Sequence, residues 1–198
     1  MNFVVLSSSR GTTFQGILDR TADGALTAEF LGLIADREDR GCVAKARAAK
    51  VPVRVVTRIE GEEREAYDAR ISTAIDDLGG NANTVIAAIG WLLLLSPSFV
   101  ADHRGKILNV HPSLLPKHPG MHAHEDVLKS GDRETGMTIH LIDDGMDTGK
   151  ILLQKSCPVL PNDTPETLKG RVQELEKEWY PKVLQMLETG KLRIDNSA

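Results

Sequence analysis

The side chains best suited to chemistry lie in one short segment, residues 108–116, which reads Leu-Asn-Val-His-Pro-Ser-Leu-Leu-Pro. Asn109 and His111 are two residues apart at the end of an apolar run, so on a strand their side chains leave the same face. An amide donor beside a titratable imidazole can stabilise a developing oxyanion, and the imidazole can also move a proton. Asp147, in a later turn, could orient and charge the imidazole. The pattern predicts an acyl-transfer site, and the alternative is a polar strand end that caps a loop.

A second candidate is the turn over residues 7–13, Ser-Ser-Ser-Arg-Gly-Thr-Thr, between a predicted strand and a predicted helix. The free N–H groups of a helix start, the helix dipole and nearby hydroxyls suit a phosphate or another anion. The alternative is a solvated turn in which Thr12 or Thr13 caps the helix. Residues 145–151 resemble a phosphate loop, but the glycines stand too close together and no Ser or Thr follows Lys150.

The histidines are clustered, since all six lie between His103 and His140, and Asp143, Asp144 and Asp147 follow closely. A bound metal must therefore be considered. No HExxH or CxxC pattern supports it, and His118 and His122 lack a predicted helix that would place them on one face. We expect structural or acid–base histidines and no metal.

Short apolar runs alternate with helical patterns in the first half of the chain. Strands are predicted at 2–7, 30–35, 51–56 and 84–89, and helices at 12–20, 41–49 and 62–78. Continuous apolar strands separated by helices indicate a parallel sheet covered on both faces, with its ligand crevice at the carboxyl ends of the strands. The active-site candidates lie at such ends.

The second half continues the same layer pattern with fewer helices. Strands are predicted at 106–110, 135–142 and 151–159, with a proline-containing loop up to residue 123. A C-terminal helix begins near Asp163-Thr164-Pro165 and is closed by Gly190, and Pro181 is expected to interrupt it. Its apolar stripe comprises Leu168, Val172, Leu175 and Trp179. The expectation is a single α/β domain over residues 1–198.

Composition excludes several classes of protein. The chain has 24 Lys and Arg against 28 Asp and Glu, a formal net charge of −4, so it offers no broad basic field for nucleic acid. Its most apolar stretch, residues 84–95, is too short to span a membrane and contains Gly90. The start lacks signal-peptide features, and Cys42 and Cys157 have no disulfide or CxxC spacing. We expect two core thiols in a cytoplasmic protein.

The motif residues resemble a known family. Asn109-x-His111-Pro-Ser-Leu-Leu-Pro, then Pro119-Gly120, then Asp144-x-x-Asp147-x-Gly149, is similar to the signature of the folate-dependent formyltransferases. Within that family the chain looks most like the members that formylate glycinamide ribonucleotide in purine biosynthesis. The resemblance runs from Met1 to about Ile194. It implies a Rossmann-like formyltransferase fold, with a mostly parallel central sheet, helices on both faces and a long C-terminal helix.

The resemblance also implies the chemistry. The primary amine of glycinamide ribonucleotide would attack the formyl group of 10-formyltetrahydrofolate, the co-substrate, through a tetrahedral intermediate without a metal. Asn109, His111 and Asp147 would be catalytic. The residues implied for the ribonucleotide are Gly11, Thr12, Thr13, Pro112, Gln173 and Glu176. The residues implied for the folate are Arg64, Leu92, Leu93, Leu94, Asn109, Ile142, Asp143, Asp144 and Asp147.

Other functions remain open at this point. Thr12, Thr13 and Leu93 depart from the family pattern, so the acceptor could be another small amine, such as an amino-sugar nucleotide. The same departures fit a degenerate nucleotide-binding paralogue, and the crowded His and Asp residues fit a metal-dependent hydrolase. The expected partners are small molecules, with no nucleic acid and no membrane, and the expected assembly is a monomer or homodimer.

Overall fold

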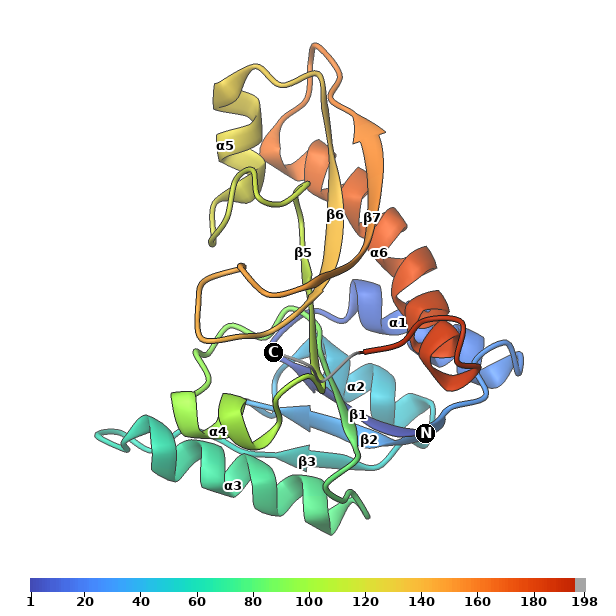
Figure 1. The fold of residues 1–198 in the computed structure, drawn as a ribbon, viewed down its shortest axis with the longest axis vertical. Coiled ribbons are helices and arrows are strands. Elements are labelled where there is room, and N and C mark those ends of the chain that lie inside the picture. Colours follow the sequence, from blue (N-terminus) through green and yellow to red (C-terminus); the bar gives the residue numbers. More distant parts are fainter. Residues whose placement is uncertain (195–198) are drawn as a thin grey trace.

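The computed structural model describes residues 1–194 and contains one seven-stranded sheet (Figure 1). The strands are β1 Asn2–Ser7, β2 Glu29–Ala35, β3 Val53–Val55, β4 Val85–Ala88, β5 Ile107–His111, β6 Glu134–Leu141 and β7 Ile151–Pro158. The helices are α1 Thr12–Ala22, α2 Gly41–Ala48, α3 Arg64–Asp77, α4 Pro97–Asp102, α5 Ala123–Ser130 and α6 Pro165–Glu188. The strand order is β3-β2-β1-β4-β5-β6-β7, and only the β5–β6 and β6–β7 pairings are antiparallel.

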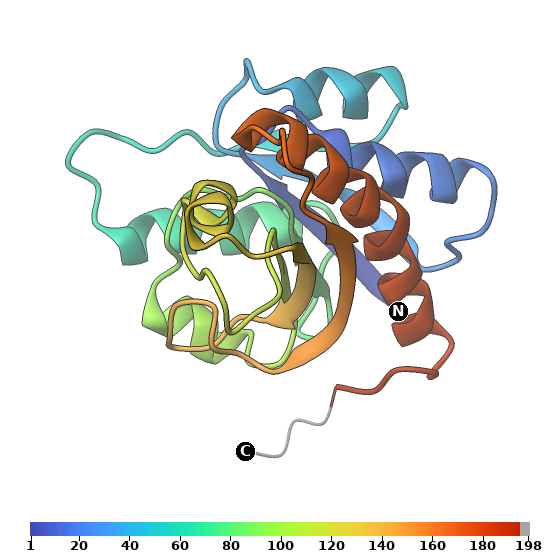
Figure 2. The ribbon, with the colours of Figure 1, turned by 90° about the horizontal axis from the view of Figure 1, so that it is seen from above.

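The central strands are buried on both faces, which explains their continuous apolar runs. Phe3 and Val5 of β1 pack into a core shared with α1, α2 and α6. Val4 and Leu6, which point the other way, join a second core under α3 and α4. Figure 2 shows these two sets of helices on opposite sides of the sheet. The predicted α/β class, the mostly parallel sheet and the long C-terminal helix are confirmed.

Helix α6 begins as the sequence predicts and ends later than the proline suggested. Thr164 is its N-cap, and its hydroxyl accepts a hydrogen bond from the N–H of Thr167. The expected interruption at Pro181 is wrong, because the helix continues through this buried residue to Glu188. A proline inside a helix removes the bond to the carbonyl four residues earlier, here that of Lys177. Gly16 of α1 packs so tightly there that an added Cβ would lie 2.1 Å from the Lys177 carbonyl oxygen. Packing against α1 therefore holds the helix in place.

Two short helices were not predicted, because each is too brief to show a helical period. Ser96 is the N-cap of helix α4, and its hydroxyl accepts a hydrogen bond from the N–H of Phe99. Pro97 is in the first turn. This Ser-Pro start signal is present in the sequence. Helix α5 follows the segment predicted as loop and is closed by Gly131, at φ +73°. Its position matters because it carries His124 and leads to Asp132.

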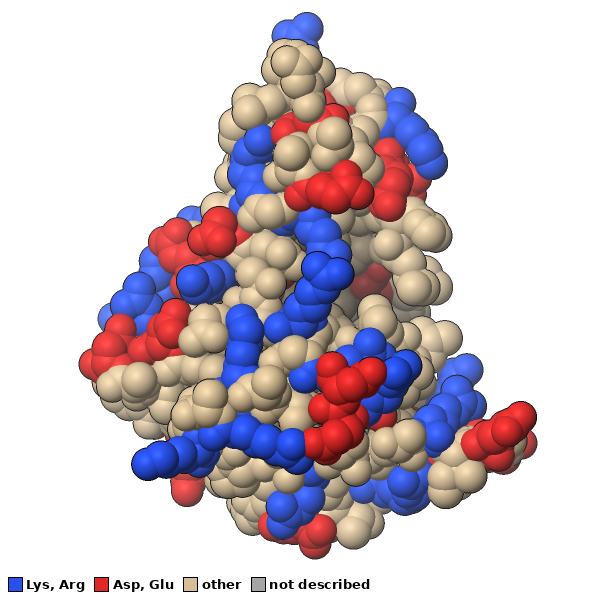
Figure 3. Space-filling view, turned by 180° about the vertical axis from the view of Figure 1, so that it is seen from behind, with Lys and Arg blue, Asp and Glu red and all other residues tan. Residues whose placement is uncertain are grey.

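Composition argued against a membrane-spanning protein, a disulfide-linked protein and a nucleic-acid-binding protein, and the structure gives observations on each. None of the helices within residues 1–194 combines the length and apolar character needed to cross a bilayer. Cys42 and Cys157 are free thiols and both are buried, as predicted. Figure 3 shows both Lys and Arg and Asp and Glu side chains on the face that it displays.

Candidate active site

The three predicted catalytic residues meet at the end of β5. The His111 Nδ1 atom lies 3.3 Å from Oδ2 of Asp147. The loop after β6, which carries Asp147, crosses β5 (Figure 1) to make this contact. Asn109 Nδ2 lies 3.1 Å from His140 Nε2, and that nitrogen is 3.5 Å from the other Asp147 oxygen. Asn109, His111 and Asp147 therefore belong to one polar network, closed by a residue that was not predicted.

The unpredicted member, His140, enters the network through strand register. β5 and β6 are antiparallel, and Asn109 pairs directly with His140, so their side chains share a face. His140 Nδ1 lies 2.8 Å from the carbonyl oxygen of Leu141, so Nδ1 carries a hydrogen. Nε2 then faces both the Asn109 amide and Asp147, and it accepts from Asn109 when it carries no hydrogen itself. The second N–H of the Asn109 amide has no part in this bond. His140 thus orients the amide and leaves one donor for a ligand.

Asp147 is a half-buried anion on a backbone conformation that is rare for a residue with a side chain. It has a φ of +56°, and its Oδ2 accepts the Gly120 N–H at 2.8 Å. His140, the Gly120 N–H and His111 together lower the pKa of Asp147 to about 2, against the opposing effect of burial. Asp147 is therefore ionised at neutral pH and faces both imidazoles.

His111 is buried, and both of its ring nitrogens face acceptors. Nε2 lies 2.7 Å from the main-chain oxygen of His118, and Nδ1 faces Asp147. Burial lowers the pKa of His111, while the His118 carbonyl and Asp147 act in the opposite direction. Only the protonated ring can donate to both neighbours. The site is thus built to accept a proton on His111 during a reaction and to stabilise the cation that forms.

The predicted anion turn lies at the carboxyl end of β1. Gly11 is the residue before α1, has a φ of +80°, and an added Cβ would lie 3.0 Å from the Cα of Cys42. Its N–H donates to Ser9 Oγ at 3.1 Å, and Thr12 begins the helix. Lys45, which the sequence analysis missed, places its Nζ 2.9 Å from the Gly11 carbonyl oxygen. Spacing along the chain gave no signal for this lysine, because α2 packs beside the turn only in the folded protein.

Thr13 and Glu176 join this turn to α6. Thr13 Oγ1 donates to Glu176 Oε2 at 2.6 Å, and both side chains are buried. Burial raises the pKa of Glu176 from 4.5 to about 7, and the Thr13 hydroxyl opposes that rise. Gln173 is half-buried one helical turn before Glu176, and Pro112 is half-buried beside His111. The residues implied for the ribonucleotide therefore come from three separate elements.

The residues implied for the folate are more dispersed. Leu92 and Leu94 are exposed, whereas Leu93 and Ile142 pack against the core under α3 and α4. Only part of this apolar set is therefore accessible to a ligand.

The polar residues implied for the folate make contacts of different kinds. Asp143 accepts from the Gly145 N–H and the Thr148 hydroxyl, which closes its own turn. Asp144 lies 3.6 Å from Arg104 at the surface. Arg64 is exposed at the start of α3, and within residues 1–194 no hydrogen bond or ion pair joins it to the network. Their roles stay predictions.

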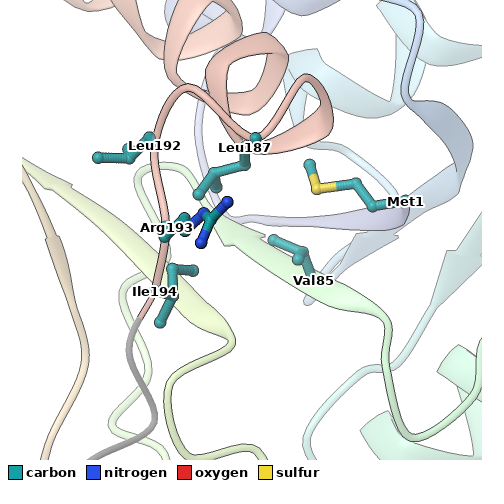
Figure 4. A pocket seen from close by; sticks show the side chains of 7 residues that line it. Met1, Val85, Leu187, Leu192, Arg193 and Ile194 are labelled. Carbon is teal, nitrogen blue, oxygen red and sulfur yellow. The ribbon is translucent and has the colours of Figure 1, made fainter.

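Two cavities lie in different parts of the protein. One of about 240 Å³ lies beside Asp147 and is lined by Leu115, Pro116, Pro119, Met146, Thr148, Gly149 and Ile151. The other, of about 350 Å³, lies at the amino ends of β1 and β4 (Figure 4) and is lined by Met1, Val85, Leu187, Gly190, Leu192, Arg193 and Ile194. The first adjoins the titratable network, so chemistry is expected there. In the part of the chain that the structure describes, no three His, Cys, Asp or Glu side chains are grouped to hold a metal.

The chain is similar to several known proteins in both sequence and structure. A family model described as "Formyl transferase" matches residues 1–184. The phosphoribosylglycinamide formyltransferase of Escherichia coli K12 is 34% identical over 198 residues, covering 100% of this chain and 92% of that protein. The glycinamide ribonucleotide transformylase 1 of Symbiobacterium toebii has a similar structure, with a TM-score of 0.91, 31% identity, and coverage of 98% and 93% of the two chains. The Brucella melitensis phosphoribosylglycinamide formyltransferase has a TM-score of 0.85 at 36% identity, covering 93% of each chain.

Proposed function

Because the chain belongs to the formyl transferase family, we propose that it transfers the formyl group of 10-formyltetrahydrofolate to the primary amine of glycinamide ribonucleotide. The observation that carries the proposal is the network of Asn109, His111 and Asp147 at the carboxyl end of β5. Its donors and its anion are those that an acyl transfer through a tetrahedral intermediate requires. The reaction is a step of purine biosynthesis.

The amide of Asn109 stabilises the oxyanion that forms when the amine attacks the formyl carbon. His140 engages one of its N–H groups, which leaves the second aimed by the same rigid amide. The His111 ring supplies the second donor. Its contact with Asp147, at 3.3 Å, is longer than its 2.7 Å contact with the His118 carbonyl. The substrate oxygen therefore replaces Asp147 at Nδ1, and Nε2 keeps its carbonyl partner.

Proton movement completes the transfer. The attacking amine loses a proton, and N10 of the folate gains one when its bond to the formyl carbon breaks. Burial keeps the pKa of His111 below its ordinary value, so the resting ring is neutral at pH 7 and can take a proton as negative charge develops. Ionised Asp147 stabilises the resulting imidazolium and orients the water through which the proton reaches N10. No covalent bond to the protein forms.

Substrate positioning follows from the elements around the network. The Gly11–Thr13 turn takes the phosphate on the first N–H groups of α1, with the ammonium of Lys45 nearby. Gln173 and Glu176 hold the ribose and amine end, and Pro112, which follows His111 in the chain, contacts the same substrate. The folate lies along Leu92–Leu94 and the 142–147 turn, with Arg64 at the edge.

The test is conversion of 10-formyltetrahydrofolate, followed by absorbance, with and without glycinamide ribonucleotide. Asn109→Ala and His111→Ala should each lower turnover by about 100- to 1000-fold, the usual loss for one oxyanion donor. His103→Gln is a matched control, because the His103 ring packs at a tilted angle against Phe99, and within residues 1–194 no hydrogen bond or ion pair joins it to the network. Wild-type rates in either network variant would refute the mechanism.

The same assay can also identify a different formyl-accepting amine. Thr13 and Glu176 already bond to one another in the acceptor site, so the acceptor must compete for that carboxyl group. If an amino-sugar nucleotide is formylated faster than glycinamide ribonucleotide, the proposed acceptor changes and the proposed mechanism stays the same. Absence of transfer to any amine would support a nucleotide-binding paralogue.

We also propose a single-domain protein whose partners are these small molecules, as a monomer or homodimer in the cytoplasm. The two buried free thiols support a reducing compartment.

A further inference from the structure

We propose that His118 and Asp132 form a positioning pair that holds the main chain of residues 117–120 against His111 and Asp147. The proposal rests on the proposed function, because it assigns a role relative to those two catalytic residues. Neither side chain of the pair touches the reacting groups. Both act through main-chain atoms of the segment between them and the network.

The segment contacts both catalytic side chains through its backbone. The His118 carbonyl oxygen lies 2.7 Å from Nε2 of His111, and the Gly120 N–H donates to Asp147 Oδ2 at 2.8 Å. These two main-chain groups are two residues apart, so they move together. A shift of this segment would change the partners of His111 and Asp147 at the same time.

His118 needs side-chain contacts to stay in place. Its φ of +53° is in the left-handed region, which is disfavoured for a residue with a side chain unless the surroundings hold it there. Ser113 Oγ donates to the Lys117 carbonyl at 2.6 Å and reaches the His118 carbonyl at 3.2 Å. Those bonds fix the main chain from one side only.

The other side is held by Asp132. His118 Nε2 lies 2.9 Å from Asp132 Oδ2, and their side chains are 16% and 26% exposed. Lys117 Nζ lies 3.2 Å from the same carboxylate but is 66% exposed. The hydrogen bond from His118, ahead of that from Lys117, lowers the pKa of Asp132. Asp132 follows the closing glycine of α5, so the pair ties the segment to the end of a helix.

The position of this segment determines where His111 carries its hydrogen and how readily the ring is protonated. A carbonyl oxygen at Nε2 requires hydrogen on that nitrogen, so in the neutral ring Nδ1, which faces Asp147, is the nitrogen that takes up the proton. The same carbonyl favours the protonated ring. Asp147, His140, His118 and His124 are the other titratable groups near His111; Asp147 raises its pKa, whereas His140 and His118 lower it. The side chains of the pair contact neither Asp147 nor His140. Loss of the pair should therefore weaken the imidazolium and leave the binding of both substrates almost unchanged.

Four variants separate this role from a general effect on the surface. Asp132→Ala removes the acceptor, and Asp132→Asn retains an oxygen at the same position. Lys117→Met removes only the exposed partner. Asp126→Ala is the matched control, because it deletes another acidic residue of the same region, paired with Lys129 at 3.7 Å on the surface of α5.

The first readout is steady-state kinetics. Asp132→Ala should lower kcat about tenfold while KM for each substrate changes less than about twofold, since misplaced catalytic groups lose rate without losing binding. Asp132→Asn should recover most of that loss. Lys117→Met and Asp126→Ala should match the wild type. Unchanged kcat in Asp132→Ala, or an equal fall in Asp126→Ala, would overturn the proposal.

The second readout does not depend on turnover. The titration of His111 can be followed by NMR of its ring C–H signals in each variant without substrates, with the signal assigned by its loss in His111→Ala. The pKa of His111 should be lower in Asp132→Ala than in the wild type and unchanged in Asp126→Ala. An unaltered titration overturns the positioning role even in an active enzyme. A wild-type protein without transferase activity would instead refute the proposed function, and this titration would still decide the role of the pair.

Discussion

Replacing Glu176 by Gln should stabilise the folded protein at pH 8 and leave its stability almost unchanged near pH 4. Glu176 is buried against Thr13, and its hydroxyl partner cannot offset the loss of water around a charged carboxylate. Gln has nearly the same size and keeps an oxygen that can accept from Thr13. The substitution therefore removes the ionisation and preserves the packing.

The magnitude follows from the pKa of Glu176, which burial raises from 4.5 to about 7. Between these two values the folded state binds more protons than the unfolded state, so the stability of the wild type falls as pH rises. Above pH 7 the full cost is present, and 2.5 pKa units correspond to about 3 kcal/mol. Glu176→Gln has no such cost at any pH, so its advantage grows across the same window.

Urea denaturation of both proteins at pH 4 and pH 8 measures this difference. We expect the free energies of unfolding to agree within about 0.5 kcal/mol at pH 4 and to differ by about 3 kcal/mol at pH 8. A difference of the same size at both pH values would refute the reasoning, because it would come from packing rather than ionisation. Thr13→Val is a useful companion, since loss of the hydroxyl should raise the pKa of Glu176 further.

Three further predictions concern other parts of the structure. Asp147→Asn removes the negative charge 3.3 Å from His111, so kcat should fall by about 100-fold, the usual size of an acid–base contribution, and unchanged kinetics would contradict the role assigned beside His111. Gly16→Ala would force a Cβ within 2.1 Å of the Lys177 carbonyl oxygen, and thermal or urea unfolding should show a loss of about 2 to 3 kcal/mol. Tyr180→Phe removes the 2.8 Å hydrogen bond to a β5 carbonyl and should cost about 1 kcal/mol with activity retained; a larger loss of activity than of stability would argue against a purely structural role.

Local patterns in the sequence were sufficient for most of the fold. Residues 3–6 alternate between two cores, and a run that is apolar at each of these positions fits both cores only as an inner strand. The start of α6 was predictable because capping is a local interaction among Thr164, Pro165 and Thr167. Its continuation past Pro181 was not, because the compensation comes from Gly16, far away in the chain.

In the candidate site, too, some features follow from local sequence and others depend on tertiary structure. Asn109 and His111 share a face because alternate residues of any strand do, so the sequence alone was enough to pair an amide with an imidazole. Asp147 was chosen as the carboxylate from its place in a later turn and from the resemblance of Asp144-x-x-Asp147-x-Gly149 to the family signature.

The partners that set the chemistry of these groups depend on tertiary structure. His140 reaches Asn109 only through the register of two antiparallel strands, and the His118 carbonyl reaches His111 only through the path of a loop. Burial, which lowers the pKa of His111 and raises that of Glu176, is a property of packed elements. The sequence determined which groups are available for the reaction, and the fold decided their protonation and orientation, because desolvation and hydrogen-bond distance exist only after distant segments pack together.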